Sequence, residues 1–146
     1  MLVDTFQDVD RRVSAEELER FLAPMRADFR GTTEAWVRRN LFVGHSDSKL
    51  VERIATDMAD GPAAVGLSAM ENIRRYDEGA ALAVVRVPVR LINADRFLTN
   101  LGAARRRKPD VSLAVMPGVG HFLMMEDPDE FNRLLARAVK ELLATR

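Results

Sequence analysis

A strand–helix–strand pattern in the last third of the sequence leaves few folds open to this chain. The segments VRVPVRLIN and VSLAVM place apolar side chains at every second position, which is the period of a β-strand. The polar segment between them, about 99–108, is predicted to be a helix. Strands joined in this way are parallel, with a right-handed connection. The sequence therefore predicts an α/β fold.

The carboxyl-terminal segment predicts a long amphipathic helix. Asp127, Pro128 and Glu130 supply a capping residue, a proline suited to the first helical position and an acidic residue in the first turn. Apolar residues from Phe131 to Leu143 then recur every three or four positions. We expect this apolar stripe to pack on the sheet.

The first half of the chain is helical in pattern. Ser14 and Glu17 form a capping box, and Pro24 is expected to kink or end the helix that follows. Further helices are expected at about 33–42, from 48 to Gly61, and at about 63–76. The sequence therefore predicts a helical region ahead of the parallel strands.

Composition excludes several classes of site and partner. Lysine and arginine (22) balance aspartate and glutamate (22), which argues against nucleic acid or an anionic membrane as partner. The basic run 105–108 is expected to complement a helix dipole and face water. The chain has no cysteine, and its two histidines lack the spacing of metal ligands, so neither a disulfide nor a metal site is expected.

The amino-terminal segment does not resemble a targeting sequence. MLVDTFQDVDRR is too acidic for a signal peptide, and no apolar run approaches the roughly 18 residues that a membrane span requires. We therefore expect a cytoplasmic protein without membrane attachment.

Two polar residues follow the predicted strands, where parallel sheets carry their chemistry. Asp95 comes after RLINA, and His121 comes after AVMPGVG. A carboxylate on one ring nitrogen of a histidine fixes its tautomer and leaves the other nitrogen able to take a proton. The alternatives are that Asp95 caps the next helix and that His121 is a turn residue beside Gly120.

These segments resemble the α/β-hydrolase family. PVRLINADRFLTN is similar to its acid-bearing turn, and VMPGVGHFLMMEDPDEFNRLL is similar to its histidine loop and last helix, most of all in cofactor-independent esterases and haloperoxidase-like members. The opening LVDTFQD resembles the sixth strand and its turn. The resemblance implies that Asp95 is the acid and His121 the histidine of a catalytic triad, with no cofactor.

The resemblance also implies a division of the chain. Residues 1–13 correspond to the sixth-strand segment and its turn, 14–79 to a helical cap, and 80–146 to the carboxyl-terminal βαβα part of the core. The expected fold is a partial α/β-hydrolase fold, a short parallel sheet of about three strands with a helical cap. Only the back half of a complete hydrolase is covered.

Two serines look like nucleophiles and fail on context. A nucleophile elbow is a tight turn between a buried strand and a helix, flanked by small residues. Ser46 follows a helical pattern, and Ser48 stands where the elbow requires a glycine. Ser68 lies within a helical pattern and has Met70 at that position. We therefore expect Ser46, Asp47 or Ser48 to cap a helix, and the chain to lack the nucleophile.

In the intact family the reaction would be hydrolysis of an ester or related bond through an acyl-enzyme. The cap residues Phe21, Trp36, Phe42 and Met58 are candidates to line an acyl pocket, although simple packing explains them as well. The chain by itself is expected to be inactive, because the backbone donors for the oxyanion also precede it in the resemblance.

Two kinds of partner follow from the expected gap in the fold. The amino-terminal half of the fold, or a second copy of the chain, would cover the open sheet edge. A small ester-like molecule would be the substrate once the site is completed. The alternative function is a non-catalytic remnant or interaction module that pairs with another chain through its open edge and apolar surface.

Overall fold

The computed structural model describes residues 1–144, which form two compact units. The sheet unit contains Met1–Asp10 together with the chain from Asp77 onward, and the helical unit contains Arg11–Tyr76. The chain thus leaves the sheet unit after its first strand and returns to it for the other two. The sequence prediction of a cap at 14–79 lies close to the bounds of the helical unit.

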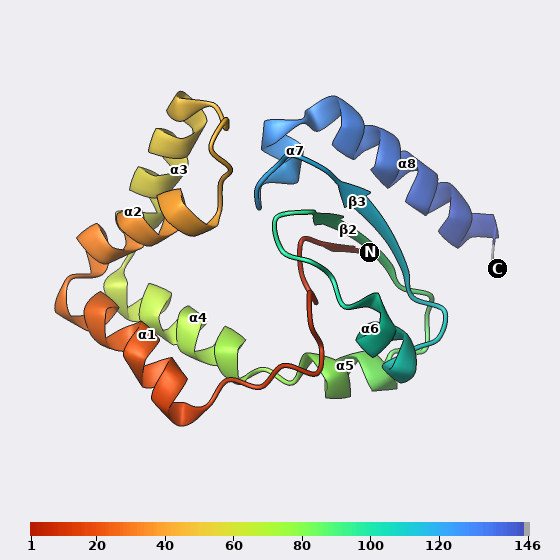
Figure 1. Cartoon of the computed structure of the whole chain (residues 1–146), viewed down its shortest axis with the longest axis horizontal. Coiled ribbons are helices and arrows are strands. Elements are labelled where there is room, and N and C mark those ends of the chain that lie inside the picture. The colour runs from red at the N-terminus through yellow and green to blue at the C-terminus, as the bar shows by residue number, and fades with distance from the viewer. Residues whose placement is uncertain (145–146) are drawn as a thin grey trace. The chain divides into compact units, whose positions relative to one another are not determined.

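The sheet unit is built on three parallel strands (Figure 1). These are β1 (Leu2–Val3), β2 (Arg90–Ala94) and β3 (Ser112–Met116), in the order β1-β2-β3. Leu91 on β2 is in register with Leu2 on β1 and Leu113 on β3. The predicted short parallel sheet of about three strands is confirmed, with α6 (Leu101–Arg107) as the connection between β2 and β3.

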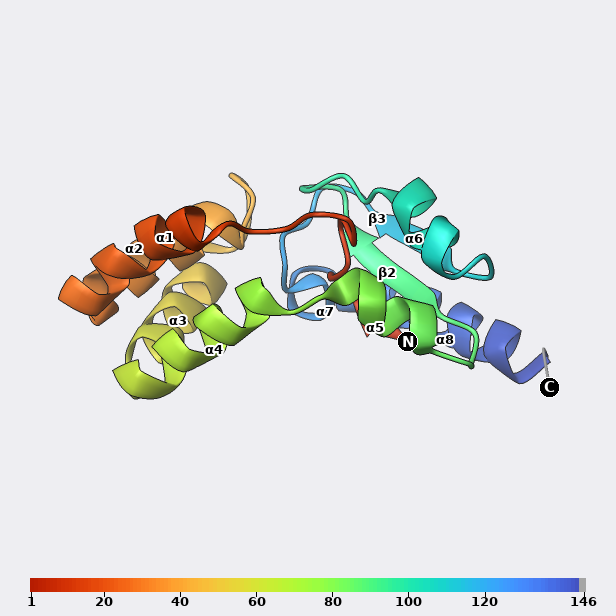
Figure 2. The ribbon, with the colours of Figure 1, turned by 90° about the horizontal axis from the view of Figure 1, so that it is seen from below.

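Alternate residues of β2 face two different layers of helices, because successive side chains of a strand point to opposite faces. Leu91 packs in a cluster with α6 and with α5 (Glu78–Val84). Ile92 packs in a second cluster with α7 (Leu123–Glu126) and α8 (Pro128–Ala144). Seen from below, α5 lies in front of the strands and α8 behind them (Figure 2). The strand is therefore buried on both faces.

Helix α5 was not predicted from the sequence. Its seven residues, EGAALAV, are too few and too uniformly apolar for the period to separate helix from strand. The local signal for the helix is Asp77, whose side chain accepts a hydrogen bond from the backbone N–H of Ala80 at 2.8 Å. This bond satisfies one of the donors that a helix start leaves open.

The helical unit consists of α1 (Ala15–Ala27), α2 (Phe29–Asn40), α3 (Ser48–Ala59) and α4 (Ala63–Arg75). The predicted capping box is present: the Ser14 hydroxyl accepts from the Glu17 N–H at 3.1 Å, and the Ser14 N–H donates to the Glu17 carboxylate at 2.9 Å. These bonds lower the pKa of Glu17. Pro24 lies within α1, which ends three residues later.

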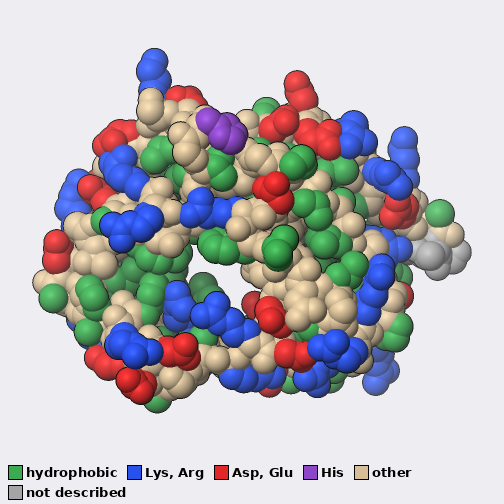
Figure 3. Space-filling model, viewed as in Figure 1, with side chains coloured by type: hydrophobic (Ala, Val, Ile, Leu, Met, Phe, Trp, Pro, Cys, Tyr) green, Lys and Arg blue, Asp and Glu red, His purple; other side chains and the backbone are tan. Residues whose placement is uncertain are grey.

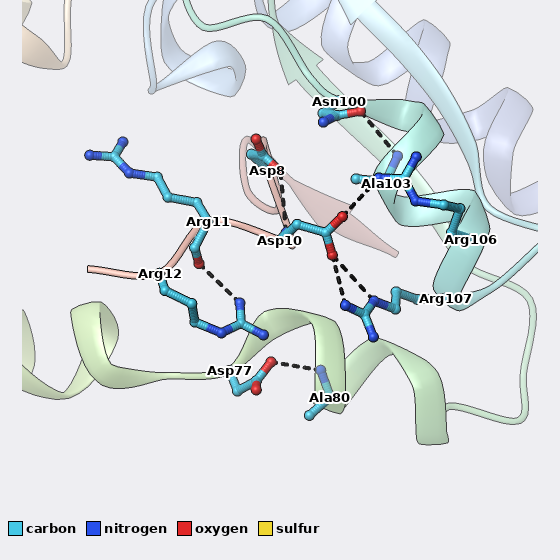
Figure 4. A network of polar contacts seen from close by, with 10 residues as sticks. All are labelled: Asp8, Asp10, Arg11, Arg12, Asp77, Ala80, Asn100, Ala103, Arg106 and Arg107. Atoms are coloured by element: carbon cyan, nitrogen blue, oxygen red, sulfur yellow. Dashed lines mark hydrogen bonds and ion pairs between the residues drawn. The ribbon is translucent and has the colours of Figure 1, made fainter. Parts of the chain in front are cut away.

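Asp10 ties the end of the first chain segment to α6 (Figure 4). Its carboxylate binds the guanidinium groups of Arg106 at 2.8 Å and Arg107 at 2.9 Å. The expectation that the whole run 105–108 faces water is therefore wrong. The Lys108 side chain is only 11% exposed and pairs with Asp110 at 2.8 Å.

Charge is mixed on the surface that Figure 3 presents. Basic and acidic side chains alternate there with apolar ones, and neither sign gathers into one broad patch on that face. Within residues 1–144, no helix combines the length and the apolar character needed to cross a bilayer.

The Asp10 contacts make stability depend on pH in a definite direction. The hydrogen bond from Arg107, followed by that from Arg106, holds the pKa of Asp10 below its ordinary value. A carboxylate with a lowered folded-state pKa stabilises the fold above its unfolded pKa, and this contribution is lost as pH falls through the folded value. We expect Asp10→Asn to reduce the loss of stability between about pH 5 and pH 2, measured as urea midpoints.

Arg107→Gln is the matched variant and should reduce the same acid dependence. Both differences should shrink in high salt, because these charges are exposed and therefore screened. An Asp10→Asn protein with the wild-type pH profile would show that the contacts contribute nothing.

Candidate active site at the carboxyl edge of the sheet

Three loops meet where the parallel strands end. Asp4 directly follows β1, Asp95 directly follows β2, and His121 lies in the loop after β3. The carboxyl ends of parallel strands lie at the same edge of a sheet, and this edge is where such folds place their functional side chains. The fold therefore brings together polar residues that are far apart in the sequence: Asp4 and His121 are separated by 117 positions.

His121 is hydrogen-bonded to Asp4. Its Nδ1 lies 2.6 Å from Oδ2 of Asp4, a short separation, and hydrogen bonds to ionised groups are shorter than those between neutral groups. The Asp4 side chain is 7% exposed, whereas that of His121 is 43% exposed. When the carboxylate is ionised and the imidazole is neutral, the carboxylate can only accept a hydrogen bond, so Nδ1 carries the proton and Nε2 has a free lone pair. The ring is thus set up to accept a proton from a reacting group.

The backbone at Asp4 holds an unusual conformation. Its φ is 43°, in the left-handed region that residues other than glycine seldom adopt. Two bonds to β2 hold it there: the Asp4 N–H donates to the Ile92 carbonyl at 2.9 Å, and Oδ1 accepts from the Ala94 N–H at 3.0 Å. Both carboxylate oxygens of Asp4 are therefore engaged, one by the histidine and one by the strand.

Asn93 fixes the loop that follows Asp4. Its side chain is fully buried, at 0% exposure. The amide oxygen accepts from the Thr5 N–H at 3.3 Å, and the amide nitrogen donates to the Thr5 carbonyl at 2.8 Å and the Thr99 hydroxyl at 3.0 Å. This side chain ties the loop after β1 to the loop after β2, and so supports the position of Asp4.

Asp95 lies at the same edge with a different partner. Its Oδ1 accepts from the Gly118 N–H at 3.0 Å, and its own N–H donates to the Met116 carbonyl at 3.2 Å. The carboxylate on His121 in this structure is that of Asp4, and the role of Asp95 as the catalytic acid stays a prediction. Asp95 does not cap the next helix, because α6 is capped by Asn100.

Asp4 was not predicted to be a site residue, although the sequence contains a signal for it. In LVDTF an aspartate directly follows a short apolar strand segment, which is the feature that singled out Asp95 in RLINAD. The sequence could place both carboxylates at strand ends. Which of them reaches His121 depends on the lateral order of the strands and on the loops.

The candidate pocket residues all lie in the helical unit. Phe21 and Trp36 pack edge to face at a centroid distance of 5.9 Å, and the Arg74 guanidinium stacks 3.7 Å above Phe21. Burial lowers the pKa of Arg74. Phe42 is 3% exposed, as expected of a packing residue, and Met58 is partly buried. A role in substrate binding stays a prediction for Phe21, Trp36, Phe42 and Met58.

The two lookalike serines do not follow strands. The Ser46 hydroxyl accepts from the Val43 N–H at 3.0 Å in the turn before α3, whose capping residue is Asp47. Ser68 lies inside α4, where its hydroxyl accepts from the Asn72 amide at 3.3 Å. Each hydroxyl thus has a local structural partner in the helical unit.

A model of the alpha/beta hydrolase family matches residues 2–134. The chain belongs to this family. The match includes β1, the helical unit, β2, β3 and the first part of α8. The family resemblance predicted from the sequence is confirmed.

Solved structures of related fold agree. An esterase from Thermogutta terrifontis is 18% identical, with a TM-score of 0.73 over 90% of this chain and 53% of its own. A bromoperoxidase from Bacillus anthracis is 17% identical, with a TM-score of 0.73 over 95% of this chain and 54% of its own. A hydrolase from Oleispira antarctica is 15% identical, with a TM-score of 0.72 over 88% of this chain and 48% of its own.

The chain spans about half the length of these similar structures. At such identities the likeness shows the fold alone. A comparison with curated proteins finds no significant match. Neither the family match nor the similar structures favours the alternative of a non-catalytic interaction module.

Because the hydroxyls of Ser46 and Ser68 make local hydrogen bonds, replacing either serine should have a small effect on stability. Ser46→Ala and Ser68→Ala should each lower the free energy of unfolding by at most about 1–2 kcal/mol, because each loses one turn or helix-surface hydrogen bond. Ser14→Ala, which removes a true helix cap, is the matched control and should cost about 1 kcal/mol. Chemical denaturation measures all three.

A fluorophosphonate probe, which labels activated serines, should modify none of the three positions. Labelling of Ser46 in the wild-type chain, absent in Ser46→Ala, would show that this serine is a nucleophile after all.

Proposed function

We propose that this chain forms the acid–histidine part of a serine-hydrolase site that cleaves ester or related bonds. The observation that carries the proposal is the 2.6 Å bond between His121 and a buried carboxylate at the carboxyl edge of the sheet. This arrangement fixes the tautomer of the ring and stabilises the imidazolium that forms when the ring accepts a proton.

In the proposed reaction, Nε2 of His121 takes the proton of a serine hydroxyl as that oxygen attacks the acyl carbon. The same nitrogen then gives the proton to the leaving alcohol, and water releases the acyl group by the reverse sequence. The substrate is a small ester-like molecule. The helical unit serves as a cap, with Phe21 and Trp36 as part of the acyl pocket.

The nucleophile and the oxyanion donors are proposed to come from polypeptide outside this sequence. None of the serines in residues 1–144 stands on a tight turn that leads directly from a strand into a helix, because Ser14, the one serine between β1 and α1, comes eleven positions after the strand. Strands β1 and β3 are the edges of the described sheet, and an edge offers unpaired backbone groups for a further strand. The amino-terminal half of the fold would add its strands at one of these two edges and complete the site. A second copy of the chain is the other candidate to pair with an open edge.

The chain by itself should therefore hydrolyse short acyl p-nitrophenyl esters no faster than its His121→Ala variant. Removal of an oxyanion donor alone costs roughly 10²–10³ in rate, and loss of the nucleophile leaves the histidine nothing to activate except water. Initial rates at neutral pH measure the difference. Robust activity of the wild-type chain that is lost in His121→Ala would show that the chain contains its own nucleophile.

A fusion of the amino-terminal half of the Thermogutta terrifontis esterase to this chain tests the proposal in the positive direction. We expect the folded fusion to hydrolyse the same esters and to lose at least about 100-fold in rate on His121→Ala. His45→Ala, which changes the other histidine, is the matched control and should leave the rate unchanged. A fusion that folds by circular dichroism but is insensitive to His121 would overturn the proposal.

A further inference from the structure

We infer that Asp4 is the carboxylate that positions His121, and that Asp95 instead holds the loop on which His121 lies. The inference deepens the proposed function, since the catalytic meaning of His121 rests on that proposal. It departs from the assignment that sequence resemblance suggested, in which Asp95 is the partner of the histidine.

Asp4 has the geometry of a positioning residue. Oδ2 lies 2.6 Å from Nδ1 of His121, while Oδ1 accepts from the buried Ala94 N–H at 3.0 Å. With one oxygen fixed by strand β2, the plane of the carboxylate is set and the other oxygen is directed at the ring. A side chain that is 7% exposed has little freedom to turn away.

The backbone around Asp4 is held in unusual conformations. Asp4 has a φ of 43° and Phe6 has a φ of 56°, so two of three consecutive non-glycine residues are in the left-handed region. The buried Asn93 amide binds both backbone groups of the intervening Thr5. Such strain persists only where surrounding bonds enforce it, and here they point the Asp4 side chain at His121.

Asp95 acts on the loop and leaves the ring to Asp4. Its carboxylate binds the N–H of Gly118, which has a φ of 73° in the turn that leads to His121. On the far side of that turn the Gly120 N–H donates to the Glu126 carboxylate at 2.9 Å. Asp95 and Glu126 thus hold the two sides of the turn, and Asp4 holds the ring.

An amide at position 4 separates the two assignments. Asn has one acceptor oxygen where Asp has two, so Asp4→Asn cannot accept from both the Ala94 N–H and His121. The backbone N–H is buried and costly to leave unpaired, whereas the half-exposed histidine can use water. The amide oxygen should therefore face Ala94, and its NH₂ group should face Nδ1. A nitrogen that meets a donor must give up its proton, so the ring should change to the Nε2–H tautomer.

The experiment is long-range ¹H–¹⁵N NMR of the His121 ring in the full chain, at a pH where the imidazole is neutral. We expect the Nδ1–H tautomer in the wild type and the Nε2–H tautomer in Asp4→Asn. Asp95→Asn is the matched control: its amide oxygen can still accept from the Gly118 N–H, so the tautomer should not change. The opposite pattern, with Asp95→Asn changing the tautomer and Asp4→Asn leaving it unchanged, would overturn the inference.

A second measurement does not depend on the folding of Asp4→Asn. Replacement of His121 by Phe should shift the ¹³Cγ resonance of Asp4 and leave that of Asp95 in place. A shift confined to Asp95 would contradict the inference. Both measurements are independent of ester hydrolysis, so failure here is distinguishable from failure of the proposed function.

Discussion

The pairing of β2 with a parallel strand on each side is the interaction on which the rest of the sheet unit depends. It places Leu91 against the α5 and α6 layer and Ile92 against the α7 and α8 layer, so one five-residue strand anchors both halves of the core. Because all three strands run in one direction, their carboxyl ends share an edge. Loops from distant parts of the sequence must therefore meet there.

The polar residues at that edge are bound to β2 as well as to each other. Asp4 bonds to the backbone of β2 at Ile92 and Ala94. Asn93, on β2, bonds to Thr5 in the loop after β1 and to Thr99 in the loop after β2. Buried polar groups of this kind are costly unless each has a partner, and a network in which all are paired becomes rigid. The orientation of His121 is thus a consequence of how β1 docks on β2.

Membership of the alpha/beta hydrolase family gives this arrangement its chemical meaning. The chain contributes the acid–histidine side of the proposed site and a helical unit inserted between β1 and β2. The similar structures are about twice as long, and the proposed nucleophile belongs to the part of the fold that they have beyond this match. A histidine held by a carboxylate becomes a catalyst only when a nucleophile and oxyanion donors face it.

The sequence by itself determined the elements whose signals are local. Alternation in VRVPVRLIN and VSLAVM indicated the parallel strands, the Ser14–Glu17 box indicated the start of α1, and Asp127-Pro128 indicated the start of α8. Each of these signals lies within a few residues of the structure it specifies, and hydrogen bonds or side-chain period connect the two directly. His121 could be found in the same way, by its place after a strand.

Only the tertiary structure decided which groups meet. The sequence placed carboxylates after two strands. Asp4 reaches His121, 117 positions away, because β1 pairs with β2. The carboxylate of Asp95 instead accepts a hydrogen bond from the Gly118 N–H. The contacts of Arg106 and Arg107 with Asp10 were also missed, because Asp10 lies far from them in the sequence. The burial of Lys108 was missed because it depends on tertiary packing. Local pattern fixes what a segment becomes, whereas strand order and loop conformation fix which side chains come within bonding distance.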